Sequence, residues 1–226
     1  MRNTILILMM LFCSFVVKAQ QQKYPPEGFV YLHKVIPEIQ LEVRYHGSNN
    51  FLGKPVQGYT QPVILISEAA ATSLKKVAAD LKRQGYGLKV FDAYRPQRAV
   101  NHFMQWAQDP EDTLAKASFY PEIPKNQLFN LGYIASRSGH TRGSSIDLTL
   151  VDLQEGCEVD MGSTYDFFGE ISHQGTNLIS QQQEQNRNIL KEAMLRHGFD
   201  LYPEEWWHFS LKNEPFPNTY FDFPIK

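Results

Sequence analysis

The chain is poor in cysteine, which limits how it can be stabilised and what metal site it can form. Cys13 and Cys157 are its only cysteines among 226 residues, and Cys13 lies in an amino-terminal segment that we expect to be removed. An exported chain with one remaining thiol forms no internal disulfide, so its stability has to come from a packed core. A cysteine-rich metal site is excluded, and a transition metal would need histidine and carboxylate ligands.

The chain also lacks an excess of positive charge. Its 22 Lys and Arg residues and 24 Asp and Glu residues give a formal net charge of −2, and no basic stripe is present. Nucleic acid and anionic membranes are therefore not expected partners. The length and the 42% hydrophobic content are typical of one globular domain. No heptad or interface pattern indicates an oligomeric state.

The one long apolar run lies at the amino terminus. It extends from Ile5 to Val17, after Arg2 and before Ala19. The run is short for a transmembrane helix, and its flanks are typical of an export signal. The sequence predicts a signal peptide over 1–19, a mature domain over 20–226, and an exported, periplasmic protein without stable membrane insertion after cleavage. A retained membrane anchor is the alternative interpretation.

Hydrophobic spacing predicts helices and strands without a regular strand–helix–strand repeat. We therefore expect an α+β fold: a single domain with a central, mainly antiparallel sheet and flanking helices. Helices are predicted over 67–83 with Ser67 as N-cap, from Pro96 to about 107, and over 183–197. Strands are predicted over 41–45, 87–93 and 144–151, and a closing strand or hairpin over 199–211. The segments 49–60 and 110–130 are predicted to be irregular.

A histidine in a glycine-flanked turn is followed by an aspartate on a strand. His140 and Asp147 are separated by seven residues, and Gly143 allows the chain to bend between them. Asp147 alternates with Ile146 and Leu148, and a carboxylate in an apolar strand is costly unless it is paired or bound to metal. Asp147 could instead bond to a backbone amide or an arginine.

A second polar group lies near the carboxyl terminus. Glu205 and His208 flank Trp206 and Trp207, whose rings would exclude water from a site. Alone, this segment fits two core tryptophans and an ordinary core histidine. Combined with His140 and Asp147, it gives two imidazoles and a carboxylate, which is the ligand set of a catalytic zinc site with one open position. Glu205 would then act as the general base.

Arg95 follows a predicted strand in the sequence Tyr94-Arg95-Pro96. A fixed guanidinium can stabilise the oxyanion that forms when water attacks a carbonyl. The competing interpretation is a surface arginine paired with Asp92.

The motifs His-x-x-Gly-x-x-x-Asp, Glu-Trp-Trp-His and Tyr-Arg-Pro together closely resemble those of the VanX-type D-alanyl-D-alanine dipeptidases. These enzymes belong to a zinc peptidase family that also contains D,D-carboxypeptidases. The resemblance extends over about 41–211, and the segments 138–150 and 161–167 resemble the dipeptidase branch. The chain departs from the family pattern at Gly139, where a larger residue is more common, and at Ser145, where alanine is common.

The resemblance implies a role for each of nine residues. One zinc ion per chain would bind His140, Asp147 and His208, with Glu205 as base and Arg95 on the oxyanion; Asp166 would take the substrate ammonium, Ser138 and Tyr59 its carboxylate, and Tyr45 would line the pocket. The implied activity is hydrolysis of free D-alanyl-D-alanine in cell-wall metabolism. Two alternatives remain: a D,D-carboxypeptidase acting on peptidoglycan stem peptides, and a non-catalytic, zinc-stabilised binding module.

Overall fold

The computed structural model describes residues 24–226, so the predicted signal peptide lies outside the described residues. A five-stranded sheet forms its centre, in the order β2-β4-β5-β7-β6. β2 is parallel to β4, and the other neighbours are antiparallel. The strands are β2 Gln40–Leu41, β4 Tyr86–Asp92, β5 Ser145–Asp152, β6 Phe199–Tyr202 and β7 Glu205–Leu211, and β1 Phe29–Tyr31 pairs with β3 Leu65–Ser67 in a separate two-stranded sheet.

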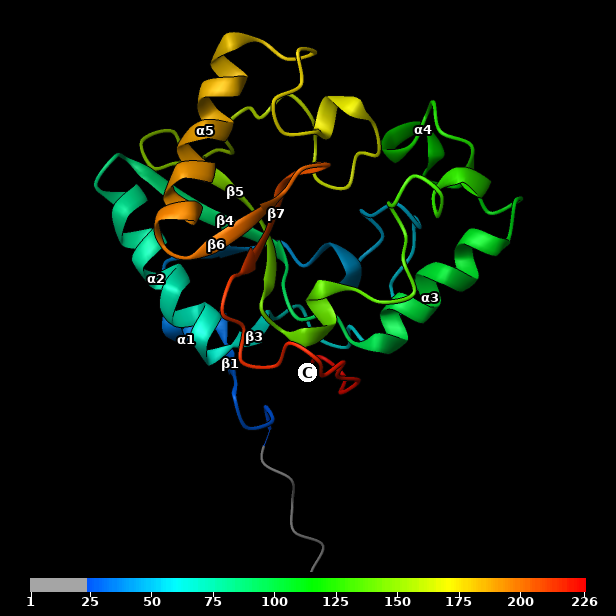
Figure 1. The fold of residues 1–226 in the computed structure, drawn as a ribbon, viewed down its shortest axis with the longest axis horizontal. Helices are drawn as coiled ribbons and strands as arrows, with labels where there is room; N and C mark the ends of the chain where they lie inside the picture. Colours follow the sequence, from blue (N-terminus) through cyan, green and yellow to red (C-terminus); the bar gives the residue numbers. More distant parts are fainter. Residues whose placement is uncertain (1–23) are drawn as a thin grey trace, which may run out of the picture.

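Helices lie on both sides of the central sheet (Figure 1). α2 Glu68–Lys82 and α5 Gln181–Arg196 are on one side, and α3 Gln97–Gln108 and the short α4 Lys116–Phe119 are on the other. These features confirm the predicted single-domain α+β fold. The short helix α1 Leu32–Val35 was not predicted, nor were β1 and β3. Within 24–226 no helix combines the length and hydropathy needed to cross a bilayer.

The predicted strand over 41–45 is largely wrong. Only Gln40–Leu41 pairs as a strand, and the chain then forms a 3₁₀ turn over Arg44–His46. The turn buries Tyr45 in the core, where its ring packs against Phe51 and Phe103. Burial of this large ring outweighs the weak strand preference of the segment.

Helix α2 shows how local sequence and packing agree. The Ser67 hydroxyl accepts a hydrogen bond from the Ala70 amide at 3.3 Å, which caps the helix as predicted. Leu74, Val77 and Leu81 recur at helical spacing and are fully buried. They provide the apolar face that packs against β4 and fixes the strand that precedes Arg95.

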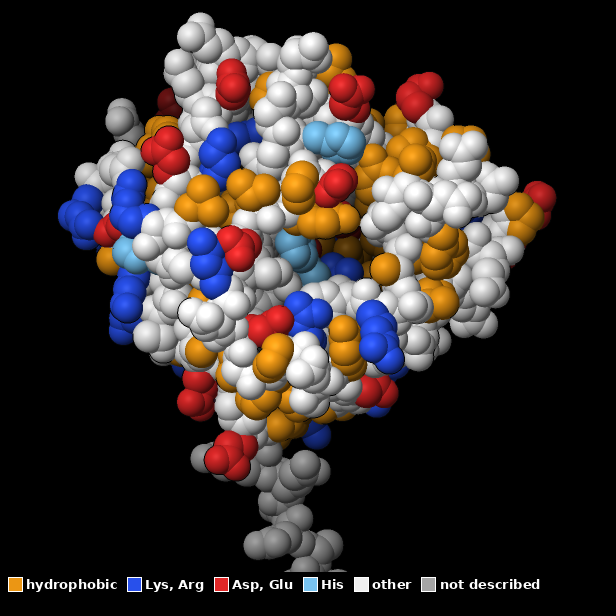
Figure 2. Space-filling model, in the orientation of Figure 1, with side chains coloured by type: hydrophobic (Ala, Val, Ile, Leu, Met, Phe, Trp, Pro, Cys, Tyr) orange, Lys and Arg blue, Asp and Glu red, His pale blue; other side chains and the backbone are white. Residues whose placement is uncertain are grey.

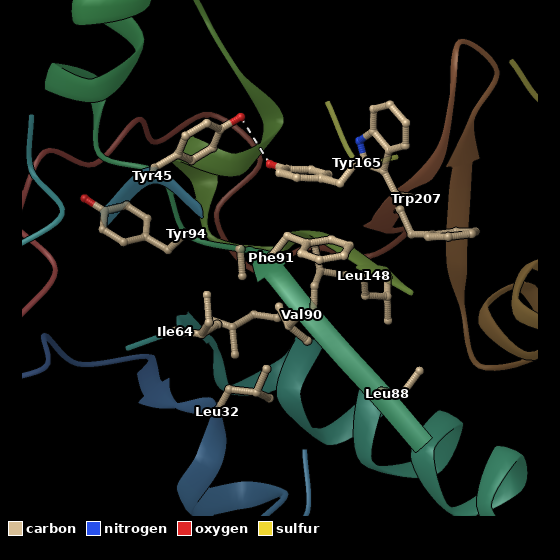
Figure 3. Packing of buried hydrophobic residues seen from close by; sticks show 14 of the residues in the cluster. Leu32, Tyr45, Ile64, Leu88, Val90, Phe91, Tyr94, Leu148, Tyr165 and Trp207 are labelled. Atoms are coloured by element: carbon tan, nitrogen blue, oxygen red, sulfur yellow. Dashed lines mark hydrogen bonds between the residues drawn. The ribbon is translucent and has the colours of Figure 1, made fainter. Parts of the chain in front are cut away.

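Strand β5 is buried on both faces. Leu148 belongs to the apolar layer that also contains Leu32 and Ile64, whereas Tyr165 covers the opposite side of the sheet (Figure 3). Asp147, on the face opposite Leu148, is only 1% exposed. The predicted polar face of β5 therefore points into an aromatic layer and not into solvent, and charges placed there interact strongly.

Candidate metal centre and active site

The 3₁₀ turn Gly139–Arg142 positions His140. The Ser138 hydroxyl caps the turn by accepting from the His140 amide at 3.3 Å, and Gly143 ends it with a φ of +84°, which favours glycine. The imidazole Nδ1 lies 2.7 Å from the Ala93 carbonyl oxygen and donates to it. This bond leaves the lone pair on Nε2, which faces Asp147 and His208.

Strand pairing brings the other two predicted ligands together. Asp147 on β5 and His208 on β7 are directly opposite in the antiparallel register. Facing side chains in such a pair lie about 5 Å apart at Cβ, so both can reach one ion. The Ser210 hydroxyl lies 3.3 Å from His208 Nε2 and can accept from it, in the tautomer whose lone pair is on Nδ1.

The three donor atoms have the spacing that zinc requires. His140 Nε2 lies 3.0 Å from His208 Nδ1 and 3.3 Å from Asp147 Oδ1, and His208 Nδ1 lies 3.0 Å from Asp147 Oδ1. Tetrahedral ligands at about 2.0–2.1 Å from zinc are separated by about 3.3 Å. Two imidazole lone pairs and a carboxylate facing one another repel unless a proton or a metal cation lies between them. The donor set therefore fits a zinc ion and leaves its fourth position open.

The surroundings of Asp147 favour its charged form. Burial alone would raise its pKa, but in the metal-free site the charge and hydrogen bonds of the two protonated histidines outweigh burial and hold the pKa of Asp147 well below its usual range. Its second oxygen, Oδ2, accepts from the Tyr165 hydroxyl at 3.1 Å and lies 3.5 Å from Arg95 Nη2. Tyr165 is not among the predicted site residues, because nothing local indicates that this ring crosses to β5.

Glu205 lies beside the metal donors without joining them. Its Oε2 is 3.8 Å from His208 Nδ1, and the residue lines the same cavity. Burial raises the pKa of Glu205 to about 7, although His208 opposes the rise. A carboxylate at this distance from the donors could accept a proton from the attacking water, which a bound zinc ion would make more acidic.

Arg95 is held by a buried ion pair. Its Nε donates to Asp92 at 2.9 Å, and its guanidinium lies over the Tyr45 ring at 5.1 Å. Pairing with Asp92 was the competing interpretation, but the pair is buried, and Arg95 also lines the cavity. Asp92 therefore fixes the orientation of a guanidinium that faces the metal donors.

Tyr59 does not occupy its expected position on the cavity wall. Its hydroxyl donates to Asp92 Oδ1 at 2.8 Å, and the side chain is not among those that line the cavity. The contact of Tyr59 with the substrate carboxylate stays a prediction. In the structure the residue completes the hydrogen bonding of Asp92 behind Arg95.

Asp166 has an uncommon backbone conformation. Its φ is +62°, which costs a non-glycine residue about 1–2 kcal/mol. The side chain lines the cavity and accepts from the Tyr45 hydroxyl at 2.9 Å. Burial raises the pKa of Asp166 well above its usual range, and the charge of Asp147 adds to the rise. A cation beside Asp166 would stabilise the charged form of this buried carboxylate.

A cavity of about 310 Å³ connects these groups. Figure 2 shows it as a hollow with histidine inside, hydrophobic side chains above and cationic side chains below. The volume is at the low end of small-molecule sites, which favours a small substrate. Of the nine predicted site residues, all except Tyr59 line it: Tyr45, Arg95, Ser138, His140, Asp147, Asp166, Glu205 and His208.

Comparisons with known proteins show which family the chain belongs to. Residues 26–226 match the model of the peptidase family described as D-Ala-D-Ala dipeptidase. The chain belongs to this family. D-alanyl-D-alanine dipeptidases from Enterococcus faecium, Enterococcus faecalis and Streptomyces coelicolor are 47%, 42% and 41% identical to it. These alignments cover 87–88% of this chain and 98% of each relative, which confirms the resemblance predicted from the motifs.

The two departures from the dipeptidase family pattern are in contact with each other. A Cβ atom at Gly139 would lie 2.6 Å from the Ser145 hydroxyl oxygen, which is too close. That hydroxyl also lies 2.6 Å from the hydroxyl of Ser210 on β7. The absence of a side chain at Gly139 therefore provides the space for the Ser145 hydroxyl at the start of β5, the strand that carries Asp147.

This contact predicts a measurable coupling. Gly139→Ala alone is expected to destabilise the protein by about 1–3 kcal/mol, because Ser145 is packed in place. In the Ser145→Ala background the same change should cost at least about 1 kcal/mol less. Urea unfolding of the wild type, both single variants and the double variant, all with chelator present, measures the coupling. Additive costs would show that the two positions are independent.

Proposed function

We propose that the protein hydrolyses free D-alanyl-D-alanine to D-alanine, using one zinc ion per chain. The observation that carries the proposal is the convergence of His140, Asp147 and His208 within 3.3 Å beside Glu205. The relatives that cover 98% of their own lengths in the alignments are D-alanyl-D-alanine dipeptidases. When bound, zinc would supply Lewis acidity that acidifies water and polarises a carbonyl group.

Glu205 carries the protons in the proposed reaction. It accepts one from the attacking water and then gives it to the amine of the departing D-alanine. Arg95 donates hydrogen bonds to the oxyanion while the carbonyl carbon is tetrahedral. Asp92 holds that guanidinium in place at 2.9 Å, so little reorganisation is needed during the reaction.

Asp166 provides the selectivity for a free amino end. An ammonium at Asp166 would neutralise a buried carboxylate that is held by Tyr45 at 2.9 Å. An N-acylated amine carries no positive charge to pair with Asp166, and its acyl group takes up more space than a free ammonium. This difference favours a dipeptidase over a D,D-carboxypeptidase, whose substrate continues beyond that position. Glu205 and Arg95 favour catalysis over a binding module, because neither is needed to hold zinc.

The test compares three substrates with the mature, zinc-loaded protein. D-Ala-D-Ala, L-Ala-L-Ala and an N-acetylated D,D-tripeptide are assayed for released alanine, with and without chelator. Chelator-sensitive cleavage of D-Ala-D-Ala alone is expected. Cleavage of the blocked tripeptide would indicate a carboxypeptidase, and no cleavage of any substrate by zinc-loaded protein would favour a binding module.

We also propose that the protein is exported and acts in cell-wall metabolism from the periplasm. The support is the pattern of residues 1–19: a basic start, a short apolar run and Ala19. Mass determination of the amino terminus after cell fractionation tests this localisation. A full-length chain in the membrane fraction would favour the retained anchor.

A further inference from the structure

The cavity wall contains a cation that the reaction scheme above does not use. Arg137 lines the cavity beside Ser138. We infer that Arg137 binds the carboxylate of the dipeptide and so selects substrates with a free carboxyl end, an inference that rests on the proposed function. Asp166 and Arg137 together would make the cavity complementary to a small zwitterion.

Arg137 is the cavity arginine whose charge is available. Arg95 is paired with Asp92 at 2.9 Å, and Arg142 is paired with Glu214 at 2.8 Å. Arg137 has no ion-pair partner within residues 24–226. A substrate carboxylate therefore has no protein carboxylate to displace before it reaches this guanidinium.

The Arg137 guanidinium contacts an aromatic ring. The guanidinium lies over the Tyr220 ring at 5.0 Å, a contact worth about 0.5–1 kcal/mol at an exposed site. The segment after Tyr220 is attached to the histidine turn, because the Phe221 amide donates to the Thr141 carbonyl at 3.0 Å. The backbone just before Arg137 is fixed as well, through the Ser136 carbonyl, which accepts from Gln97 at 3.1 Å.

Ser138 supplies a second donor next to Arg137. Its hydroxyl oxygen accepts from the His140 amide, so its own proton is free to point into the cavity. A guanidinium and a hydroxyl on adjacent residues can donate to both oxygens of one carboxylate.

The experiment separates charge recognition from structural effects. Wild type, Arg137→Gln, Arg137→Lys and Arg83→Gln are compared on D-Ala-D-Ala, with D-alanyl-D-alaninamide as a competing ligand. Arg83 is the matched control, because it is exposed, pairs with Asp80 and lies outside the cavity. Arg137→Gln is expected to raise KM for the dipeptide about tenfold with kcat within about twofold, since a lost charged hydrogen bond costs about that much binding.

The amide is the decisive arm, because it lacks the carboxylate charge. Its inhibition constant should change by less than about twofold in Arg137→Gln. Arg137→Lys should keep KM within about threefold of wild type, which also guards against a folding defect in the Gln variant. Equal losses with dipeptide and amide, an unchanged KM, or a loss confined to kcat would overturn the inference. If the wild type leaves D-Ala-D-Ala intact, the proposed function fails and this inference fails with it.

Discussion

Glu205→Gln is expected to lower kcat by about 10²–10⁴-fold while zinc content stays at one per chain. Glutamine keeps the size of the side chain and an acceptor oxygen, but it cannot take a proton from water. Since Glu205 lies outside the donor triangle and 3.8 Å from His208, its neutralisation should not weaken zinc binding. Steady-state kinetics and metal analysis of the same preparation measure both quantities.

Glu204→Gln is the control for this prediction. Glu204 is the neighbouring carboxylate in the same motif, but it does not line the cavity. Its replacement should leave kcat within about twofold of wild type, as is usual for changes outside an active site. Near-native turnover by Glu205→Gln would remove this residue from the mechanism, and a matching loss in Glu204→Gln would point to a general disturbance of the loop between β6 and β7.

The parts of the site that the sequence could predict are those that depend on local patterns. The alternation of Ile146, Asp147 and Leu148 predicts the strand and its faces, and Gly143 predicts the turn after His140. These features depend on backbone preferences and on period-two burial, which act over a few residues. The three long helices were predictable for the same reason.

What could not be predicted depends on strand register and on contacts between distant segments. The pairing of Asp147 with His208 requires β7 to lie beside β5 in one register, and a slip by one residue would turn His208 to the other face. The packing of Tyr165 against Asp147 and the placing of Tyr59 behind Arg95 also arise only when distant segments meet. Motif resemblance implies a role for His208 without giving this geometry.

Arg95 shows that two competing interpretations can both describe one residue. Sequence spacing favoured an ion pair with Asp92, and motif resemblance favoured a place beside the zinc ligands. In the structure the ion pair is what positions the guanidinium, whose Nη2 lies 3.5 Å from Asp147. Whether such a pair is buried depends on tertiary packing, in this case under Tyr45 and Phe103.

His208→Ala is expected to lower zinc affinity by at least about 10²-fold. A zinc site in proteins contributes roughly 10–16 kcal/mol of binding free energy, so one of its protein ligands accounts for about 3–5 kcal/mol. Loss of the His208 imidazole also removes the side chain opposite Asp147 on the neighbouring strand. The Asp147 carboxylate would then face one imidazole, that of His140, in place of two. Dialysis against graded concentrations of a competing chelator, followed by metal analysis, gives the affinity.

His197→Ala is the matched control, because His197 pairs with Asp80 outside the cavity. His197→Ala should keep native zinc affinity.

A second readout separates metal loss from unfolding. Chelator should lower the melting temperature of wild type and of His197→Ala, because zinc binds the folded state. It should have little effect on the melting temperature of His208→Ala. A His208→Ala protein that retains stoichiometric zinc at native affinity would exclude His208 as a ligand. The zinc ion would then bind a different set of donors, and the proposed role of Glu205 beside its open fourth position would have to be revised.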